Sequence, residues 1–234
     1  MFAYCLADFF NLQLWPTGRS PVYSDVRDGL DDLVSAGVSA AGNASEVIFR
    51  LYGGWHGDVP DSRDALREMT GRATEALTKR LGRTRVRVEL ADTPIWDRSV
   101  RLLSTVQIAR LANVPARVER CAECVHPSAC TVGDLGSWFG GKCPQEGCPV
   151  KLPQVAWRHQ QKMVDSLLTA DAVTIAHTGL CDVVLIASDD ADMLPALLAL
   201  SASDLEAVRM ARRESRHEYY EGLLELGGVR TYRW

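Results

Sequence analysis

Residues 183–193 read VVLIASDDADM, an apolar run that ends abruptly in three acidic residues. These acids are Asp189, Asp190 and Asp192. The chain begins in a similar way, because the apolar run Phe2–Ala7 (FAYCLA) ends at Asp8, with Asn11 three residues further on. A continuous apolar run is typical of a buried parallel strand, and ligands of open α/β sheets gather at the carboxyl ends of such strands. We therefore expect a site for a hard cation where the two runs end.

Four strand candidates alternate with helical patterns along the chain. The predicted strands are Phe2–Ala7, Glu46–Tyr52, Arg85–Leu90 and Asp182–Ala187. The predicted helices are Tyr23–Ala36, Ser62–Leu81, Val155–Ala176 and Met193–Arg213. The alternation predicts an α/β fold of three layers, α/β/α, around a central parallel sheet. We expect residues 1–234 to form this one domain, with Gly227–Trp234 as a last edge strand.

The composition is that of an ordinary globular protein, with 234 residues of which 47% are hydrophobic. The formal net charge of −4 provides no overall attraction for nucleic acid, so a polyanion would have to bind a local basic patch. Two arginine clusters, Arg80–Arg87 and Arg209–Arg216, are either such patches or solvated faces of their elements. No apolar stretch approaches the roughly 20 residues of a membrane span, and the N-terminus lacks signal-peptide features. We therefore expect a cytoplasmic protein with no membrane partner.

Five of the seven cysteines crowd into one short segment, which in a cytoplasmic protein favours metal binding over disulfides. The spacing predicts a structural Zn²⁺ site with four thiolate ligands, Cys121, Cys124, Cys143 and Cys148. Cys130 and His126 are alternative ligands. The segment is rich in glycine and poor in core-forming residues, so we expect a zinc-stapled insertion at residues 121–150 that needs metal to fold. Its Trp138 and Phe139 either stack on unpaired bases or pack the small zinc core.

A further carboxylate comes from the helical pattern QKMVDSLLTADAVTIA, residues 161–176. Met163 and Leu167 are among the residues at helical spacing on its expected apolar face. Asp165 lies in the first turns, where the helix dipole favours a negative charge. Asp171 is six residues on and off the face of Asp165, so we expect it to cap, to face solvent or to support the site from behind.

These motifs together resemble the NYN domain, a branch of the PIN-like nuclease superfamily. Members carry a D-x-x-N start, a K-G-V-D helix and an S-G-D-x-D-F turn. Here the corresponding residues are Asp8 with Asn11 at the end of the first strand, Lys162–Asp165 with Asp171 along the helix, and Ser188–Met193 after the later strand. The resemblance covers both ends of the chain and implies a PIN-like fold with a central parallel sheet.

The chain departs from the family motifs at three positions. Met163 replaces the glycine of the helix motif, Asp189 replaces the glycine of the turn, and Met193 replaces the aromatic residue. We expect the changes at Met163 and Met193 to affect packing only. Asp189 removes conformational freedom and adds a charge, so it is either an extra ligand or a side chain that points outward.

The resemblance implies a metal-dependent ribonuclease, acting as an endoribonuclease. It places four aspartates in the acidic cluster, Asp8, Asp165, Asp190 and Asp192, with Asn11 and Ser188 as polar neighbours. Carboxylates bind Mg²⁺ or Mn²⁺, which activate a water that hydrolyses the phosphodiester without a protein nucleophile. Lys162 is either a contact to substrate phosphate or an ordinary surface lysine. The implied partners are RNA, single-stranded or structured, and a second copy of the chain as a homodimer.

Two other functions stay open at this point. One is a catalytically silent nucleic-acid-binding or protein-interaction module, which the extra Asp189 keeps open. The other is a DNA-directed or partner-activated nuclease. Helix capping alone would explain Asp8, Asp165 or Asp192 singly, because aspartate is a common N-cap. It does not explain why the acids follow separate strands and also lie on the helix between them.

Overall fold

A computed structural model describes residues 1–14, 21–55, 62–101, 106–111, 132–161, 163–212 and 218–234. The chain divides into two compact units. The first comprises Met1–Val106 and Gln161–Trp234, and the second comprises Gln107–Gln160. The predicted insertion at residues 121–150 falls inside the second unit. Among the parts of the chain so described, none of the helices has both the length and the apolar character that a membrane span requires.

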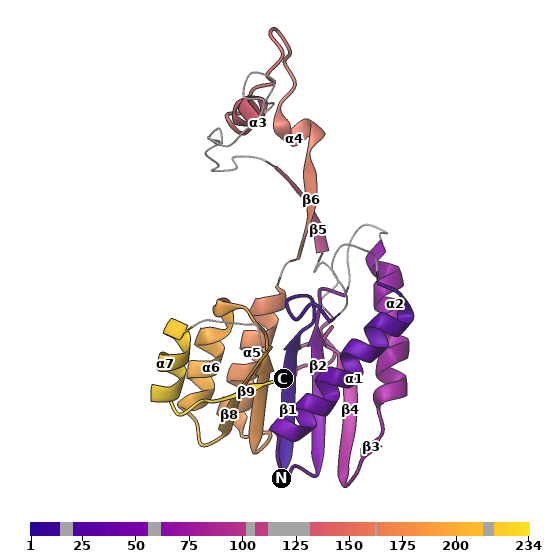
Figure 1. The fold of residues 1–234 in the computed structure, drawn as a ribbon, viewed down its shortest axis with the longest axis vertical. Coiled ribbons are helices and arrows are strands. Elements are labelled where there is room, and N and C mark those ends of the chain that lie inside the picture. Colours follow the sequence, from indigo (N-terminus) through magenta and orange to yellow (C-terminus); the bar gives the residue numbers. More distant parts are fainter. Residues whose placement is uncertain (15–20, 56–61, 102–105, 112–131, 162, 213–217) are drawn as a thin grey trace. The chain divides into compact units, whose positions relative to one another are not determined.

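The first unit is built on a seven-stranded sheet with the order β3-β4-β2-β1-β7-β8-β9 (Figure 1). The strands are β1 (Phe2–Asp8), β2 (Glu46–Tyr52), β3 (Arg80–Leu81), β4 (Thr84–Leu90), β7 (Val183–Ala187), β8 (Glu206–Ala211) and β9 (Arg230–Arg233). All neighbouring strands pair in parallel except β3 and β4, which pair antiparallel. The predicted α/β class with a mostly parallel sheet is therefore confirmed, and β9 confirms the predicted edge strand near the C-terminus.

Helices cover both faces of this sheet (Figure 1). They are α1 (Tyr23–Ala40), α2 (Ser62–Leu77), α5 (Val164–Thr178), α6 (Leu194–Ser201) and α7 (Glu218–Leu226), with a short 3₁₀ turn, η1, at Ala191–Met193. Successive residues of a strand point to opposite faces. Cys5 of β1 thus joins the core beneath α1 and α2, whereas Leu6 joins the core beneath α5 and α6. This arrangement is compatible with a three-layer α/β/α fold.

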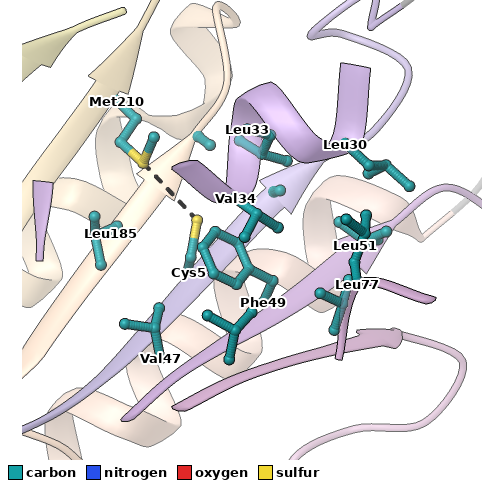
Figure 2. Close-up of a cluster of buried hydrophobic side chains, with 14 of the residues drawn as sticks. Cys5, Leu30, Leu33, Val34, Val47, Phe49, Leu51, Leu77, Leu185 and Met210 are labelled. Carbon is teal, nitrogen blue, oxygen red and sulfur yellow. Dashed lines mark hydrogen bonds between the residues drawn. The ribbon is translucent and has the colours of Figure 1, made fainter. Parts of the chain in front are cut away.

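The core beneath α1 is closely packed around Phe49 of β2 (Figure 2). Leu33 and Val34 of α1 are fully buried there, and the sulfur atoms of Cys5 and Met210 lie 3.9 Å apart. Gly37 of α1 allows the helix to approach the sheet, because a Cβ at that position would lie 2.5 Å from Phe49 Cε1. The continuous apolar runs read from the sequence are thus buried on both sides of the sheet.

Three predicted helix boundaries are wrong. The helix predicted at Val155–Ala176 begins only at Val164, because Trp157–Gln161 form the strand β6. The helix predicted at Met193–Arg213 ends at Ser201, and Glu206–Ala211 form β8 instead. The helix predicted at Ser62–Leu81 ends at Leu77, before β3. A short apolar run is compatible with the period of a helix and with that of a strand. Pairing with β7 therefore decides the structure of β8, and the last five residues of β8 are all buried.

The two arginine clusters differ in environment. Within Arg80–Arg87 the residues Arg80, Arg83 and Arg85 are exposed at the β3–β4 turn, so the solvated interpretation is confirmed there. They lie at the opposite edge of the sheet from the carboxyl ends of the strands (Figure 1). Arg209 is instead buried in β8, where its Nη1 lies 3.5 Å from Glu221 Oε1, so neither interpretation fits it.

The part of the second unit that the structure describes contains a two-stranded sheet and two helices. Its elements are β5 (Val106–Arg110), α3 (Val132–Phe139), α4 (Leu152–Val155) and β6 (Trp157–Gln161), with β5 paired to β6. Trp138 and Phe139 of α3 are half-buried and line a hollow of about 280 Å³ with Lys151 and Leu152. Of the predicted zinc ligands, Cys143 and Cys148 are described here as free, half-buried thiols.

Candidate metal centre

The sheet topology brings the first acidic strand end next to the later one. β1 and β7 are parallel neighbours, and Ala7 is paired with Ala187. Asp8 and Ser188 therefore leave the same edge of the sheet side by side. Both are nearly inaccessible, with 4% of Asp8 and 2% of Ser188 exposed. The expectation that these two strand ends meet is confirmed.

Asn11 and Ser188 connect Asp8 to Asp190. The Ser188 hydroxyl donates to Asp8 Oδ2 at 3.4 Å and accepts from the backbone N–H of Asp190 at 3.1 Å. The Asn11 side chain donates from Nδ2 to Asp190 Oδ2 at 3.4 Å, and the Asn11 backbone N–H donates to Asp8 Oδ1 at 3.3 Å. Both polar neighbours thus hold carboxylates in defined orientations.

The turn after β7 is closed by a capping hydrogen bond. Asp190 is the N-cap of η1, and its Oδ1 accepts from the Asp192 backbone N–H at 2.9 Å. Capping therefore explains part of the acidic turn, although the capping residue is Asp190 rather than Asp192. Asp165, by contrast, is the second residue of α5 and not its N-cap, which is Met163 and has no side-chain capping bond.

Asp165 and Asp192 join the group through their charges. Burial raises the pKa of Asp8 to about 6, with further upward contributions from the charges of Asp165 and Asp190 and opposing hydrogen bonds from Asn11 and Ser188. Burial, together with the charges of Asp190 and Asp192, also raises the pKa of Asp165. The four aspartates therefore form one electrostatic cluster that disfavours its own negative charge.

The cluster has the donor chemistry that a hard divalent cation requires. Among the described residues no lysine, arginine or histidine forms an ion pair with any of its four aspartates. The same described residues contain no group of three or more histidine, cysteine or acidic side chains close enough to form a ready-made metal site. Carboxylate oxygens that are not paired with a basic side chain are suitable ligands for Mg²⁺ or Mn²⁺. Mg²⁺ usually keeps several waters and binds only one or two protein carboxylates directly, so it does not require a group of three closely spaced ligands.

The side chain of Asp189 contacts different residues from that of Asp190. Its backbone N–H donates to Asn11 Oδ1 at 2.8 Å, and its side-chain Oδ1 accepts from the Arg212 backbone N–H at 3.3 Å. Burial lowers the pKa of Arg209, and the negative charges of Glu221 and Asp189 oppose this lowering only in part. The side chain thus contacts the end of β8, and the backbone supports the site through Asn11.

At Met163 the departure from the family motif affects the backbone conformation and not the packing. It has φ 63° and ψ 1°, the left-handed region in which non-glycine residues are strained, and 43% of it is exposed. The prediction that it lies on the apolar face of the helix is therefore wrong, because it precedes α5. Met193 is 1% exposed, which confirms that the third departure concerns packing.

Several predicted site residues lie outside the described residues. These are Lys162, Cys121, Cys124, Cys130 and the alternative ligand His126. Cys143 and Cys148 enclose a turn closed by a hydrogen bond from Cys148 N–H to Gln145 O at 3.2 Å. The zinc site therefore stays a prediction.

The sequence did not predict a buried polar network that involves Asp171 of α5. Arg50 of β2 is 1% exposed, and its Nη2 lies 3.2 Å from Oδ2 of Asp171, which is fully buried on α5. The Tyr52 hydroxyl donates to the same Asp171 oxygen at 2.6 Å. Burial would lower the pKa of Arg50, but Tyr52, Asp171 and Glu89 raise it, so the guanidinium stays charged. The expectation that Asp171 caps or faces solvent is wrong, whereas a supporting position fits.

A signal for this network is present in the strand itself. Arg50 is the only charged residue within the buried run of EVIFRLY, and a buried guanidinium needs an anionic partner. The spacing of the chain does not reveal that the partner lies on α5, 121 residues later.

Comparison with protein-family models, curated proteins and solved structures finds no match to this chain.

Proposed function

We propose that this protein is a metal-dependent ribonuclease that hydrolyses RNA phosphodiester bonds. The observation that carries the proposal is the convergence of four aspartates, without a paired cation among the described residues, at the carboxyl edge of a parallel sheet. This is the edge where open α/β sheets bind ligands. The resemblance of the same residues to the NYN motifs supports a nuclease of the PIN-like type.

Asp8, Asp165, Asp190 and Asp192 would hold the divalent cation. When bound, Mg²⁺ or Mn²⁺ supplies a readily deprotonated water and offsets charge on the scissile phosphate. Asn11 and Ser188 keep the carboxylates of Asp8 and Asp190 oriented through the hydrogen bonds described above. That orientation is the contribution of the chain, because a carboxylate that is free to rotate would lose entropy on each binding event.

Ser188, the hydroxyl residue of the acidic cluster in the described part of the chain, is not available as a nucleophile. Ser188 is 2% exposed, and its hydroxyl is engaged with Asp8 and the Asp190 backbone. It therefore acts as an orienting group. Hydrolysis by water, without a covalent intermediate on the chain, is the chemistry that such a site supports.

The cysteines of the second unit would bind a structural Zn²⁺ ion. Cys143 and Cys148 are free thiols close together in the chain, and the described part of the unit that contains them has two short strands and two short helices. Short elements of this kind bury little apolar surface, so a metal staple would supply folding energy. Cys121 and Cys124 are the proposed remaining ligands.

The proposed activity is tested by cutting labelled RNA. We expect single-stranded and hairpin RNA to be cut with Mn²⁺ or Mg²⁺, not with EDTA, and not by Asp190→Asn. Asp189→Asn is the matched control, since it makes the same charge change one residue away on a side chain that contacts β8. It should keep cleavage within about tenfold of wild type, because only the Asp190 carboxylate belongs to the cluster. Full activity of Asp190→Asn, with unchanged circular dichroism, would reject the assignment.

One observation fits a second candidate function as well. The described residues hold no ready-made group of three metal ligands, which agrees with a weakly held Mg²⁺ ion and equally with a catalytically silent binding module on this fold. Such a module binds RNA but shows no metal-stimulated turnover at any protein concentration. DNA of the same sequence in the same assay separates a DNA-directed nuclease from a ribonuclease.

A further inference from the structure

An exposed tryptophan lies beside the acidic cluster. Trp96 is 56% exposed and lines a groove of about 650 Å³ together with one face of α5. The residues of α5 that line it are Asp165, Ser166, Thr169, Ala170, Val173 and Thr174. Because Asp165 belongs to the acidic cluster, the groove extends from the proposed metal centre along the helix.

Trp96 is held in place by the buried network behind the cluster. The Ile95 backbone N–H donates to Asp171 Oδ1 at 2.9 Å, and Arg50 Nη2 donates to the Thr93 carbonyl at 2.5 Å. Beyond the tryptophan, Arg98 donates to both carboxylate oxygens of Glu89 on β4, at 3.2 Å and 3.1 Å. The loop is thus fastened on both sides of Trp96, so the ring is positioned before any ligand arrives.

The ring itself has no partner within the described part of the chain. Trp96 makes no hydrogen bond, aromatic contact or cation–π contact there. Trp55, by contrast, is 6% exposed, packs against Phe9 at 5.0 Å between ring centroids, and donates to the Leu51 carbonyl. An indole left in water on a fastened loop is unusual, because indoles normally bury their apolar body.

We propose that Trp96 is a stacking platform for an unpaired base of single-stranded RNA, next to the phosphate that the acidic cluster would cleave. This inference rests on the proposed function. The groove has the size of a small-ligand site and carries the hydroxyls of Ser166 and Thr169 beside the indole. The lining is mostly apolar, as the stacking face of a base requires. It also carries hydroxyls and ends at the proposed metal ligand Asp165, which favours a nucleotide over the wholly apolar face of a protein helix.

The inference is tested by binding of a fluorescein-labelled single-stranded RNA of about ten nucleotides, within the usual site sizes of such proteins. The full chain is used, with Ca²⁺ in place of Mg²⁺ or Mn²⁺. Trp96→Ala should raise Kd by roughly 5- to 100-fold, corresponding to the loss of one base–aromatic stack. Trp96→Phe should stay within about threefold of wild type, because it keeps a π face. Double-stranded RNA of the same length should bind equally to all variants.

Two controls separate stacking from other causes. Trp96→Leu keeps an apolar side chain but no π face, so it should bind as weakly as Trp96→Ala. Leu226→Ala removes a side chain that is 87% exposed on α7, and it should bind like wild type. Wild-type affinity in Trp96→Leu would overturn the inference and indicate an apolar docking surface for a protein. Absence of single-stranded RNA binding by wild type would overturn it as well.

The two proposals fail in different ways. If Asp190→Asn abolishes cleavage while Trp96→Ala binds single-stranded RNA as tightly as wild type, the stacking site is rejected and the nuclease stands. If the wild type binds RNA through Trp96 but cuts neither RNA nor DNA, the stacking site stands and the nuclease is rejected.

Discussion

Met163 adopts a left-handed backbone conformation directly before the helix that carries Asp165. A side chain in this region costs about 1 kcal/mol or more, because Cβ approaches the backbone too closely. The side chain is 43% exposed, so packing does not explain the choice of methionine. Strain at such a position is typical of functional sites, where the backbone conformation matters more than its cost.

Glycine at position 163 should stabilise the protein. We expect Met163→Gly to raise the free energy of unfolding by about 0.5–1 kcal/mol, since relief of the left-handed strain exceeds the extra entropy of the unfolded chain. Met163→Ala keeps Cβ and hence the strain, so it should bring no gain. Urea unfolding of the three proteins measures the difference. A glycine variant that is less stable than the alanine variant would contradict the strain argument.

At the scale of elements, β2, β4, α5 and the loop after β4 are joined by one polar network. Arg50 of β2 donates from Nη1 to Glu89 Oε1 of β4 at 2.5 Å and approaches Asp171 of α5. Arg98 of the loop donates to both oxygens of Glu89, at 3.1 Å and 3.2 Å. The network therefore fixes α5, which carries Asp165, and the loop, which carries Trp96, to the same two strands.

The network should make stability depend on pH through Glu89. Burial raises the pKa of Glu89, but the hydrogen bonds and charges of Arg98 and Arg50 outweigh it and bring the pKa below its ordinary value of 4.5. A lowered folded-state pKa means that the carboxylate stabilises the fold above pH 4.5, and that this contribution is lost as pH falls through the folded-state pKa. Glu89→Gln should therefore lower stability at pH 7 by about 1–2 kcal/mol and have a smaller effect in acid.

Urea unfolding at pH 7 and at successively lower pH tests this expectation. Glu206→Gln is the matched control, because its partner Arg230 lies in a pair that is about half exposed, with side-chain exposures of 47% and 49%. Exposed pairs contribute little, so this variant should follow the wild-type pH profile. A Glu89→Gln penalty that stays the same at all pH values would show that Glu89 acts through packing rather than charge.

At the scale of the whole molecule, the chain comprises two compact units of different make-up. The first rests on a seven-stranded sheet with a core on each face. The second is Gln107–Gln160, and its described part has a two-stranded sheet and two helices of eight and four residues. We expect the first to be stable by burial of apolar surface, and the second to depend on its proposed metal.

Removal of zinc should therefore affect only the second unit. We expect about one Zn²⁺ per chain by colorimetric assay, and loss of that zinc in the double variant Cys143→Ser, Cys148→Ser. Cys181→Ala, in the first unit, should keep it. Chelation should speed amide hydrogen exchange within 107–160 and leave β1 and β7 protected. Equal loss of protection in both units, or a chain without zinc, would reject this division.

The sequence alone sufficed where the determining forces act between near neighbours. The apolar runs that became β1, β2 and β7 are buried on both sides, so no alternation was needed to recognise them. Acids directly after two such runs lie at the same end of a parallel sheet, so the sequence predicted the end at which Asp8 and Asp190 lie. The pairing of β1 with β7 makes them neighbours there. The start of α6 near Pro195 and the edge strand β9 follow from equally local signals.

Only the tertiary structure could decide features that depend on distant partners. β8 is a strand because β7 offers it a pairing edge, although its own six residues fit a helix equally well. Asp171 is buried because Arg50 and Tyr52 lie opposite it, and Trp96 lines the same groove as Asp165 because Asp171 fastens the preceding residue. Local propensity and periodicity act over a few residues, whereas burial and charge pairing join residues that the chain itself keeps far apart.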